Sequence, residues 1–148
     1  MKKEHLTTSP AQTKKLGEKF AKGILKNKPK KIAFVIGLIG GLGAGKTTFL
    51  QGFVKGLGVK ETILSPTFVI MKRFRINHRF FKTFYHIDCY RINPPKELLD
   101  LGFKEIIANP KNIVAIEWAD RVRKILPQNT TILKFEFANE KTRKIMLK

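Results

Sequence analysis

The sequence predicts an α/β fold in which a mixed central β-sheet is flanked by helices and carries a β-hairpin. Apolar runs of strand length at residues 31–38 and 112–118 predict buried strands. Helical spacing of apolar residues predicts helices before and between these runs, and residues 131–137 and 142–148 predict a closing antiparallel pair. A chain of 148 residues can bury one core, so we expect residues 1–148 to form a single domain.

Local patterns place the helices in order along the chain. A first helix is expected over residues 10–26, with apolar positions at Leu16, Phe20, Ile24 and Leu25. A second helix is expected from residue 46 to a stop at Gly58, with apolar positions at Phe49, Leu50, Phe53 and Leu57. Residues 95–110 predict two short helices separated near Gly102.

Composition narrows the class of protein. The formal charge of +19 attracts polyanions, so RNA or an acidic protein is a candidate partner; a lysine-rich solvated surface is the other interpretation. Cys89 is the only cysteine, which excludes an internal disulfide and fits a reducing compartment. We find no secretory signal and no apolar segment of membrane-spanning length, so we expect a cytoplasmic protein without membrane contact.

A glycine-rich segment, GLIGGLGAGKTTF, occupies residues 37–49 between the first predicted strand and the second helix. Within it, four residues fit the spacing G-x-x-x-x-G-K-[ST] of a phosphate-binding loop, namely Gly40, Gly45, Lys46 and Thr47. Glycines allow backbone N–H groups to approach a polyphosphate. Lys46 is expected to reach the β- and γ-phosphates of a nucleotide, and the Thr47 hydroxyl is expected to bind Mg²⁺.

Hydrolysis or phosphoryl transfer also requires a carboxylate that holds Mg²⁺ and a group that orients the nucleophile. Asp88 ends the segment FYHID and Glu117 ends the run IVAIE, so both are candidates. The run before Glu117 is continuously apolar, as in a central strand, whereas the segment before Asp88 suits a position nearer the sheet edge. We favour Glu117 as the metal ligand and leave Asp88 as an outer ligand or water activator; both residues simply ending strands is the alternative.

Three further residues allow two interpretations each. His86 could be a site residue, but we prefer an interior hydrogen-bonding role. Trp118 either stacks on an adenine ring or fills core volume. Thr67, in the segment SPTF, either senses the γ-phosphate or merely follows a turn.

Residues 71–82, MKRFRINHRFFK, interleave cations with phenylalanines. Cations bind phosphates and exposed aromatic rings stack on bases, so one interpretation is a contact with RNA. The other is a β-hairpin with Phe74 inward, Arg73 and Arg75 outward, and a turn at residues 77–78. We expect the hairpin and leave open whether its cations bind RNA. These cations are Lys72, Arg73, Arg75, Arg79 and Lys82.

Taken in order, four blocks resemble the signature of the TsaE (formerly YjeE) ATPases: GLGAGKTTF, SPTF, YHIDCYR and IEW. The resemblance runs from the first helix to the last strands and implies a P-loop NTPase-like domain. Many ATPases share the phosphate loop, but its ordered combination with the other three blocks is more specific.

The resemblance also implies roles for individual residues. Thr47 and Glu117 would lie at Mg²⁺, Asp88 near the γ-phosphate, and Thr13 and Trp118 around the nucleoside. The implied catalytic residues are Lys46, Asp88 and Glu117. The implied nucleotide-binding residues are Thr13, Gly40, Gly43, Ala44, Gly45, Lys46, Thr47, Thr48, Thr67 and Trp118. The family usually has an acidic residue where this chain has Gly41, which puts fine control of hydrolysis in doubt but not phosphate binding.

The resemblance implies that the chain binds and hydrolyses ATP with Mg²⁺, weakly alone and more strongly with partners. It would serve the machinery that forms N6-threonylcarbamoyladenosine in tRNAs reading ANN codons. The implied partners are TsaB and TsaD; TsaD transfers the threonylcarbamoyl group, and ATP resets the complex between turnovers. Binding of tRNA through the basic hairpin is a further expectation.

Two other classes of function remain open on the residues alone. A small P-loop kinase for a metabolite would need an acceptor pocket and a lid, and only the basic hairpin offers one. An RNA-binding module with a purely structural nucleotide site is the other alternative.

Overall fold

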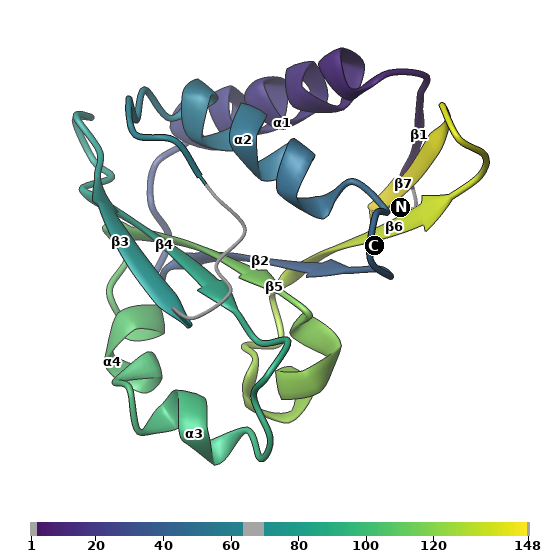
Figure 1. The fold of residues 1–148 in the computed structure, drawn as a ribbon. Coiled ribbons are helices and arrows are strands. Elements are labelled where there is room, and N and C mark those ends of the chain that lie inside the picture. The colour runs from purple at the N-terminus through teal and green to yellow at the C-terminus, as the bar shows by residue number, and fades with distance from the viewer. Residues whose placement is uncertain (1–2, 64–69, 148) are drawn as a thin grey trace.

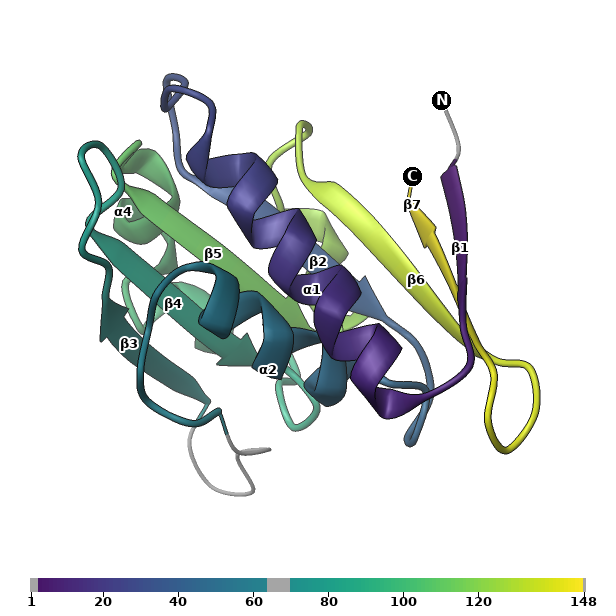
Figure 2. The same cartoon turned by 90° about the horizontal axis from the view of Figure 1, so that it is seen from above.

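The computed structural model describes residues 3–63 and 70–147. Helices α1 (Pro10–Leu25) and α2 (Lys46–Gly56) cover one face of a β-sheet. The other face carries α3 (Lys96–Leu99), α4 (Phe103–Ala108) and the 3-10 helix η1 (Ala119–Ile125), as Figures 1 and 2 show. The predicted α/β architecture, with two short helices separated at Gly102, is confirmed. In the part of the chain that is described, no helix combines the length and apolar character needed to cross a membrane.

The sheet is mixed, with a parallel centre and antiparallel edges. Its strands lie in the order β1 (Lys3–Thr7), β7 (Arg143–Leu147), β6 (Thr131–Phe137), β2 (Phe34–Ile39), β5 (Asn112–Glu117), β4 (Thr83–Asp88) and β3 (Met71–Arg75). β2 runs parallel to both β5 and β6, and β4 runs parallel to β5. The central place predicted for β5 and the more peripheral place predicted for β4 are both confirmed.

The helix boundaries follow from capping. The Ser9 hydroxyl accepts the N–H of Gln12 at 3.1 Å, so α1 begins at Pro10 as predicted. After α2, Gly58 has φ +79° and donates its N–H to the carbonyl of Lys55 at 3.0 Å, which confirms the predicted stop.

Two strands differ from the sequence prediction. β2 begins at Phe34 rather than at residue 31, because the Ala33 N–H is taken by the carbonyl of Ile107 at 2.9 Å outside the sheet. β1 is not predicted by the sequence, since most of its side chains are exposed and its pairing is to β7, at the far end of the chain.

The predicted hairpin is present, but its second arm is β4. Phe74 is buried while Arg73 and Arg75 are exposed, as expected. Residues 76–82 form the connection, which is closed by the His78 ring: its Nδ1 accepts the N–H groups of Phe80 and Phe81 at 3.1 and 3.2 Å. β4 becomes the second arm because it pairs with β3 on one side and β5 on the other.

The two long helices pack backbone against backbone. A Cβ on Gly52 of α2 would lie 1.8 Å from the carbonyl oxygen of Lys14, and a Cβ on Gly17 of α1 would lie 2.1 Å from that of Phe49. Only glycine permits this approach. Because α2 follows the glycine-rich loop directly, the contact fixes the start of α1 relative to that loop.

Candidate nucleotide-binding site

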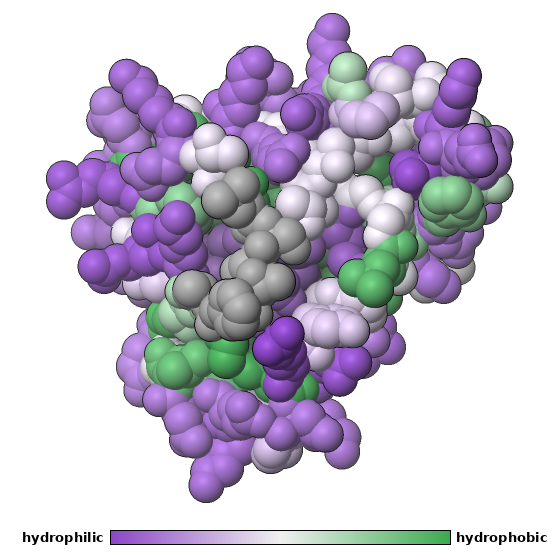
Figure 3. Space-filling model, viewed as in Figure 1, coloured by the Kyte–Doolittle hydropathy of each residue, from purple (hydrophilic) through white to green (hydrophobic). Residues whose placement is uncertain are grey.

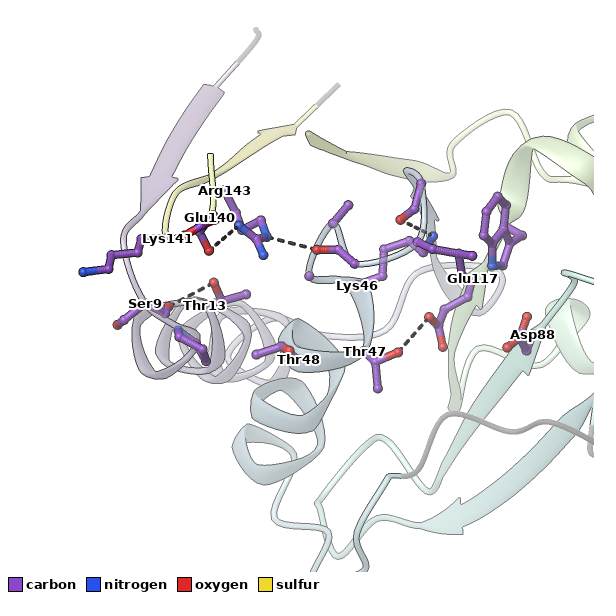
Figure 4. A pocket seen from close by; sticks show the side chains of 17 residues that line it. Ser9, Thr13, Lys46, Thr47, Thr48, Asp88, Glu117, Glu140, Lys141 and Arg143 are labelled. Atoms are coloured by element: carbon purple, nitrogen blue, oxygen red, sulfur yellow. Dashed lines mark hydrogen bonds between the residues drawn. The ribbon is translucent and has the colours of Figure 1, made fainter. Parts of the chain in front are cut away.

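The candidate site lies where the parallel strands β2, β5 and β4 end side by side. Leu38 of β2 is paired in register with Glu117, the last residue of β5, and Glu117 is paired with Asp88, the last residue of β4. β2 leads directly into the glycine-rich loop, so the loop and both carboxylates border one pocket of about 220 Å³. Figure 4 shows these side chains converging on the pocket.

The backbone of the glycine-rich loop is held in a turn that ends at the start of α2. Gly45 precedes α2 with φ +103°, a conformation that residues with a Cβ rarely adopt. The N–H of Ala44 donates to the carbonyl of Gly41 at 3.3 Å. Lys46 and Thr47 are therefore the first residues of a helix, where free N–H groups and the helix dipole favour an anion.

The Lys46 side chain folds back over the loop. Its Nζ donates to the carbonyls of Gly40 and Gly41, and it lies 3.8 Å from the centre of the Trp118 ring. Burial lowers the pKa of the Lys46 ammonium from its ordinary value, although the Glu117 carboxylate opposes this change. The pocket thus holds a largely buried cation, with loop carbonyls as its only close hydrogen-bond acceptors among the described residues.

Glu117 shares its two carboxylate oxygens between two partners. The Thr47 hydroxyl donates to Oε1 at 3.3 Å, and Nε2 of His86 lies 2.7 Å from Oε2. Glu117 and His86 are both buried. The interior hydrogen-bonding role predicted for His86 is confirmed. The sequence indicates that residues 86 and 88 share one side of β4, but it does not identify Glu117 as the partner of His86.

Asp88 faces the same end of the pocket as Glu117 (Figure 4). Its Oδ1 accepts the N–H of Tyr90 at 2.9 Å. Burial, together with the nearby Glu117 charge, raises the pKa of Asp88 above its usual value. Next to it, Trp118 packs against the Tyr90 ring with the ring centres 4.9 Å apart.

Thr13 and Trp118 both line the pocket but contact different residues. The Thr13 hydroxyl is 2.7 Å from that of Thr7, and its methyl carbon lies 3.8 Å from where a Cβ on Gly45 would be. The aliphatic part of Arg143 lies beside the same point, at 3.6 Å. Trp118 instead covers the Lys46 ammonium.

Arg143 is a pocket residue that the sequence analysis missed. Its Nε donates to the carbonyl of Gly43 at 3.1 Å and its Nη1 to that of Asn139 at 2.8 Å. No local signal identifies it, because it reaches the loop only through the position of β6 beside β2. The other missed lining residues include Ser9, Glu140 and Lys141.

The structure brings together most of the predicted nucleotide-binding residues. Those that line the pocket are Thr13, Gly43, Ala44, Gly45, Lys46, Thr47, Thr48 and Trp118. Gly40 does not line the pocket itself, but its carbonyl accepts a hydrogen bond from Lys46. Thr67 lies outside the described residues. A Cβ on Gly41, where the family usually has an acidic residue, would meet no atom within 4 Å.

The basic hairpin does not contribute to the pocket lining. Its cations are exposed, but Phe74 and Phe81 are 2% and 3% exposed and belong to the core. Base stacking on these two rings is therefore excluded, whereas Phe80 is half-buried.

A parallel strand, a glycine-rich loop with Lys46 and Thr47 at the start of a helix, and a carboxylate ending the adjacent strand define a P-loop NTPase fold. The family model described as "Threonylcarbamoyl adenosine biosynthesis protein TsaE" matches residues 7–145. The chain belongs to this family.

Similar proteins agree with this assignment. The tRNA threonylcarbamoyladenosine biosynthesis protein TsaE of Bacillus subtilis is 35% identical over 142 residues, which cover 94% of this chain and 80% of that protein. The protein of the same name from Haemophilus influenzae is 33% identical over 126 residues, covering 85% and 77%. The crystal structure of Bacillus subtilis YdiB superposes with a TM-score of 0.75 at 30% identity, covering 99% of this chain and 84% of that one.

Proposed function

We propose that residues 1–148 act as one P-loop ATPase domain that binds and hydrolyses ATP with Mg²⁺ and serves the formation of N6-threonylcarbamoyladenosine in tRNAs reading ANN codons. The observation that carries this proposal is the contact of 3.3 Å between the Thr47 hydroxyl and Glu117, beside the buried Lys46 ammonium. Hydroxyl, carboxylate and ammonium thus converge at the start of one helix. Membership of the TsaE family supports the pathway.

The residues of the pocket suit a nucleotide with its metal. A Cβ on Gly43 would meet nothing within 4 Å, so the loop has open space at its mouth. Hydroxyl and carboxylate oxygens are the donors that Mg²⁺ prefers. In residues 3–63 and 70–147, no three His, Cys, Asp or Glu side chains are grouped to hold a metal alone. In nucleotide sites, Mg²⁺ commonly takes only one or two ligands from the protein and the others from water and substrate phosphates, which fits this small set of side chains.

Each side chain has a distinct task in this proposal. Lys46 would exchange its loop carbonyls for phosphate oxygens, with which an ammonium forms stronger bonds. Thr47 and Glu117 would hold Mg²⁺, which when bound neutralises charge developing on the phosphates. Asp88 would accept a hydrogen bond from the attacking water, because its carboxylate has one oxygen engaged by Tyr90 and the other free of described partners.

The remaining residues would orient the nucleotide. The N–H groups of the loop and of the first turn of α2 would surround the phosphates; these residues are Gly40, Gly43, Ala44, Gly45 and Thr48. Thr13 would contact the nucleoside, because it lies beside Gly45 and is held by Thr7. Trp118 would either contact the nucleoside or cover the phosphate end, and its position against Lys46 favours the second. Thr67 stays a sequence prediction.

The proposed partners are TsaB and TsaD, with which hydrolysis would become efficient, and tRNA. The proposed location is the cytoplasm, which fits a tRNA pathway and the free thiol of Cys89. Support for the protein partners comes from the family, since the chain's own residues do not identify them.

The test compares ATP hydrolysis by this chain alone and with TsaB and TsaD, with and without Mg²⁺. We expect low turnover alone and a clear increase with both partners and the metal. A parallel assay follows phosphate transfer to a panel of metabolites. Transfer to a metabolite without stimulation by the partners would identify a kinase and overturn the proposal.

A further inference from the structure

Three loops meet at the end of the sheet that lies opposite the pocket. These loops are residues 26–33, 76–82 and 109–111, which precede β2, β4 and β5. Because the three strands are parallel, their amino ends lie at the same end of the sheet (Figure 2). Hydrogen bonds join the loops to one another. Lys82 donates its N–H to the carbonyl of Lys111 at 2.8 Å, and Nε2 of His78 lies 3.1 Å from the carbonyl of Leu25 at the end of α1.

This end of the sheet carries a concentration of exposed cations, which we call the basic end. Its members are Lys26, Lys28, Lys30, Lys31, Arg75, Arg79, Lys82 and Lys111. The three loops contain no Asp or Glu, and the sequence has none between Glu18 and Glu61 or between Glu61 and Asp88. At the opposite end, charges of both signs line the pocket: the carboxylates are Asp88, Glu117 and Glu140, and the cations are Lys46, Lys141 and Arg143. The basic end therefore differs from the pocket in that its loops carry cations without carboxylates.

The basic end lacks the features of a protein-binding surface. Protein interfaces contain an apolar core with aromatic anchors. The large apolar side chains that are exposed in the described residues lie on other segments, namely Leu6, Leu42, Tyr90, Leu99, Leu101 and Phe137. In Figure 3, the side on which the three loops lie in Figure 1 is predominantly hydrophilic. Phe81 is buried, and Phe80 is half-buried with the Arg79 guanidinium 5.2 Å from its ring centre, so neither ring presents a fully exposed face for stacking of unpaired bases.

A hollow of about 500 Å³ opens beside these cations. Lys28 and Lys30 line one part of it, and Asn129, which precedes β6, and Thr131, the first residue of β6, line another; most of the remaining lining is apolar. Lysine ammonium, amide and hydroxyl groups are donors that contact phosphate and ribose oxygens without reading sequence.

We propose that the basic end binds the phosphate backbone of a structured RNA, at a site separate from the nucleotide pocket. A broad array of cations without exposed aromatic rings suits the closely spaced phosphates of an A-form helix. That this RNA is tRNA rests on the proposed function. The site includes Arg75, Arg79 and Lys82 of the hairpin, but it extends over loops that are distant in sequence.

The experiment uses one cation from each loop and a matched control. The test variant combines Lys28→Gln, Arg79→Gln and Lys111→Gln. The control combines Lys96→Gln, Arg123→Gln and Lys124→Gln, which are exposed residues of α3 and η1 and remove the same charge. Binding of an RNA stem-loop is measured over a series of salt concentrations. The slope of log affinity against log salt should flatten by roughly 2 to 3 in the test variant, at about 0.7–0.9 per lost contact, and stay unchanged in the control.

Three results would overturn the proposal. Equal loss in both variants would show that only total charge matters, and an unchanged slope in the test variant would show that these residues do not contact RNA. Binding of polyglutamate in preference to RNA would identify the surface as one for an acidic protein. ADP affinity of both variants is measured in parallel. Because none of the six substituted residues lines the pocket, the ADP affinity tests the proposed ATP site independently of RNA binding.

Discussion

His86 and Glu117 form a buried pair in which Nε2 of the imidazole lies 2.7 Å from Oε2 of the carboxylate, with 3% and 4% of the two side chains exposed. The pair joins β4 to β5, and it leaves the other carboxylate oxygen directed at the Thr47 hydroxyl. An imidazole N–H that occupies one oxygen fixes the rotation of the carboxylate, in the way that outer partners orient metal ligands.

We therefore expect His86→Phe to weaken the contribution of Mg²⁺ to ADP affinity. A hydrogen bond to a charged group contributes about 1.5–3 kcal/mol, so the ratio of affinities with Mg²⁺ and with chelator should fall roughly 10- to 100-fold. His86→Gln, whose amide can still donate, should retain much of that ratio. Asn112→Ala removes another buried polar group of β5, and it should leave the ratio unchanged. Loss of Mg²⁺-independent affinity in His86→Phe would instead indicate a general structural role.

Glu117→Gln should retain ADP binding and lose most Mg²⁺-dependent hydrolysis, because the substitution keeps the size of the side chain and removes the charge that holds the metal. Single-turnover hydrolysis and ADP binding are measured for this variant and for Asp88→Asn. Asp88→Asn should lower hydrolysis with less effect on metal dependence. The reverse pattern would exchange the roles assigned to the two carboxylates.

Lys46→Ala should lower ATP affinity roughly 10- to 100-fold, the value of a charged hydrogen bond, and abolish hydrolysis. Lys55→Ala, an exposed lysine on the same helix, is the control and should behave as the parent. Circular dichroism and thermal unfolding verify that both variants fold. Parent-like affinity in a folded Lys46→Ala protein would remove this loop as the nucleotide site.

The affinity for ADP should depend on alkaline pH through Lys46. Burial lowers the pKa of the free ammonium below 10.5, whereas bound phosphates favour the protonated form and raise it again. Affinity should therefore be constant below the pKa of the free protein and decline above it, by up to about tenfold per pH unit. Lys46→Arg keeps its charge over this range, so its affinity should not decline with pH. A parallel decline in that variant would assign the effect to another group.

Gly52→Ala should destabilise the protein by roughly 1–3 kcal/mol or more, because its Cβ would overlap the backbone of Lys14. Gly23→Ala is the matched control: Gly23 is also helical and a Cβ there meets no atom within 4 Å. That control should stabilise the protein by about 0.5–1 kcal/mol through helix propensity. Urea unfolding measures both values. An unchanged midpoint for Gly52→Ala would mean that the helices can separate without cost.

The sequence predicts best the parts of the site that are contiguous in the chain. The strand, loop and helix around Lys46 are encoded by periodicity and glycine spacing within about 25 residues. The apolar run before Glu117 likewise predicts a central strand. These elements are predictable because the signals that indicate them, hydrophobic periodicity and glycine spacing, lie within one short stretch of the chain.

The parts that the sequence does not predict depend on which strands become neighbours. Arg143 reaches Gly43 because β6 pairs with β2, and no property of the segment around residue 143 indicates that pairing. The contact of His86 with Glu117 depends in the same way on the register of β4 and β5. A turn at residues 77–78 would place the second arm of the hairpin at residues 79–82. In the structure β4 pairs with β3 instead, and residues 76–82 form the connection between them.

The glycine contact between α1 and α2 has a mechanical consequence. Because the two backbones are in direct contact at Gly17 and Gly52, we expect the two helices to move as one rigid body. With 16 residues, α1 is about 24 Å long; it starts beside the pocket at Ser9 and ends where the Leu25 carbonyl meets His78 of the basic end. We therefore expect a displacement of the loop before Lys46 to shift the end of α1 that contacts the basic end.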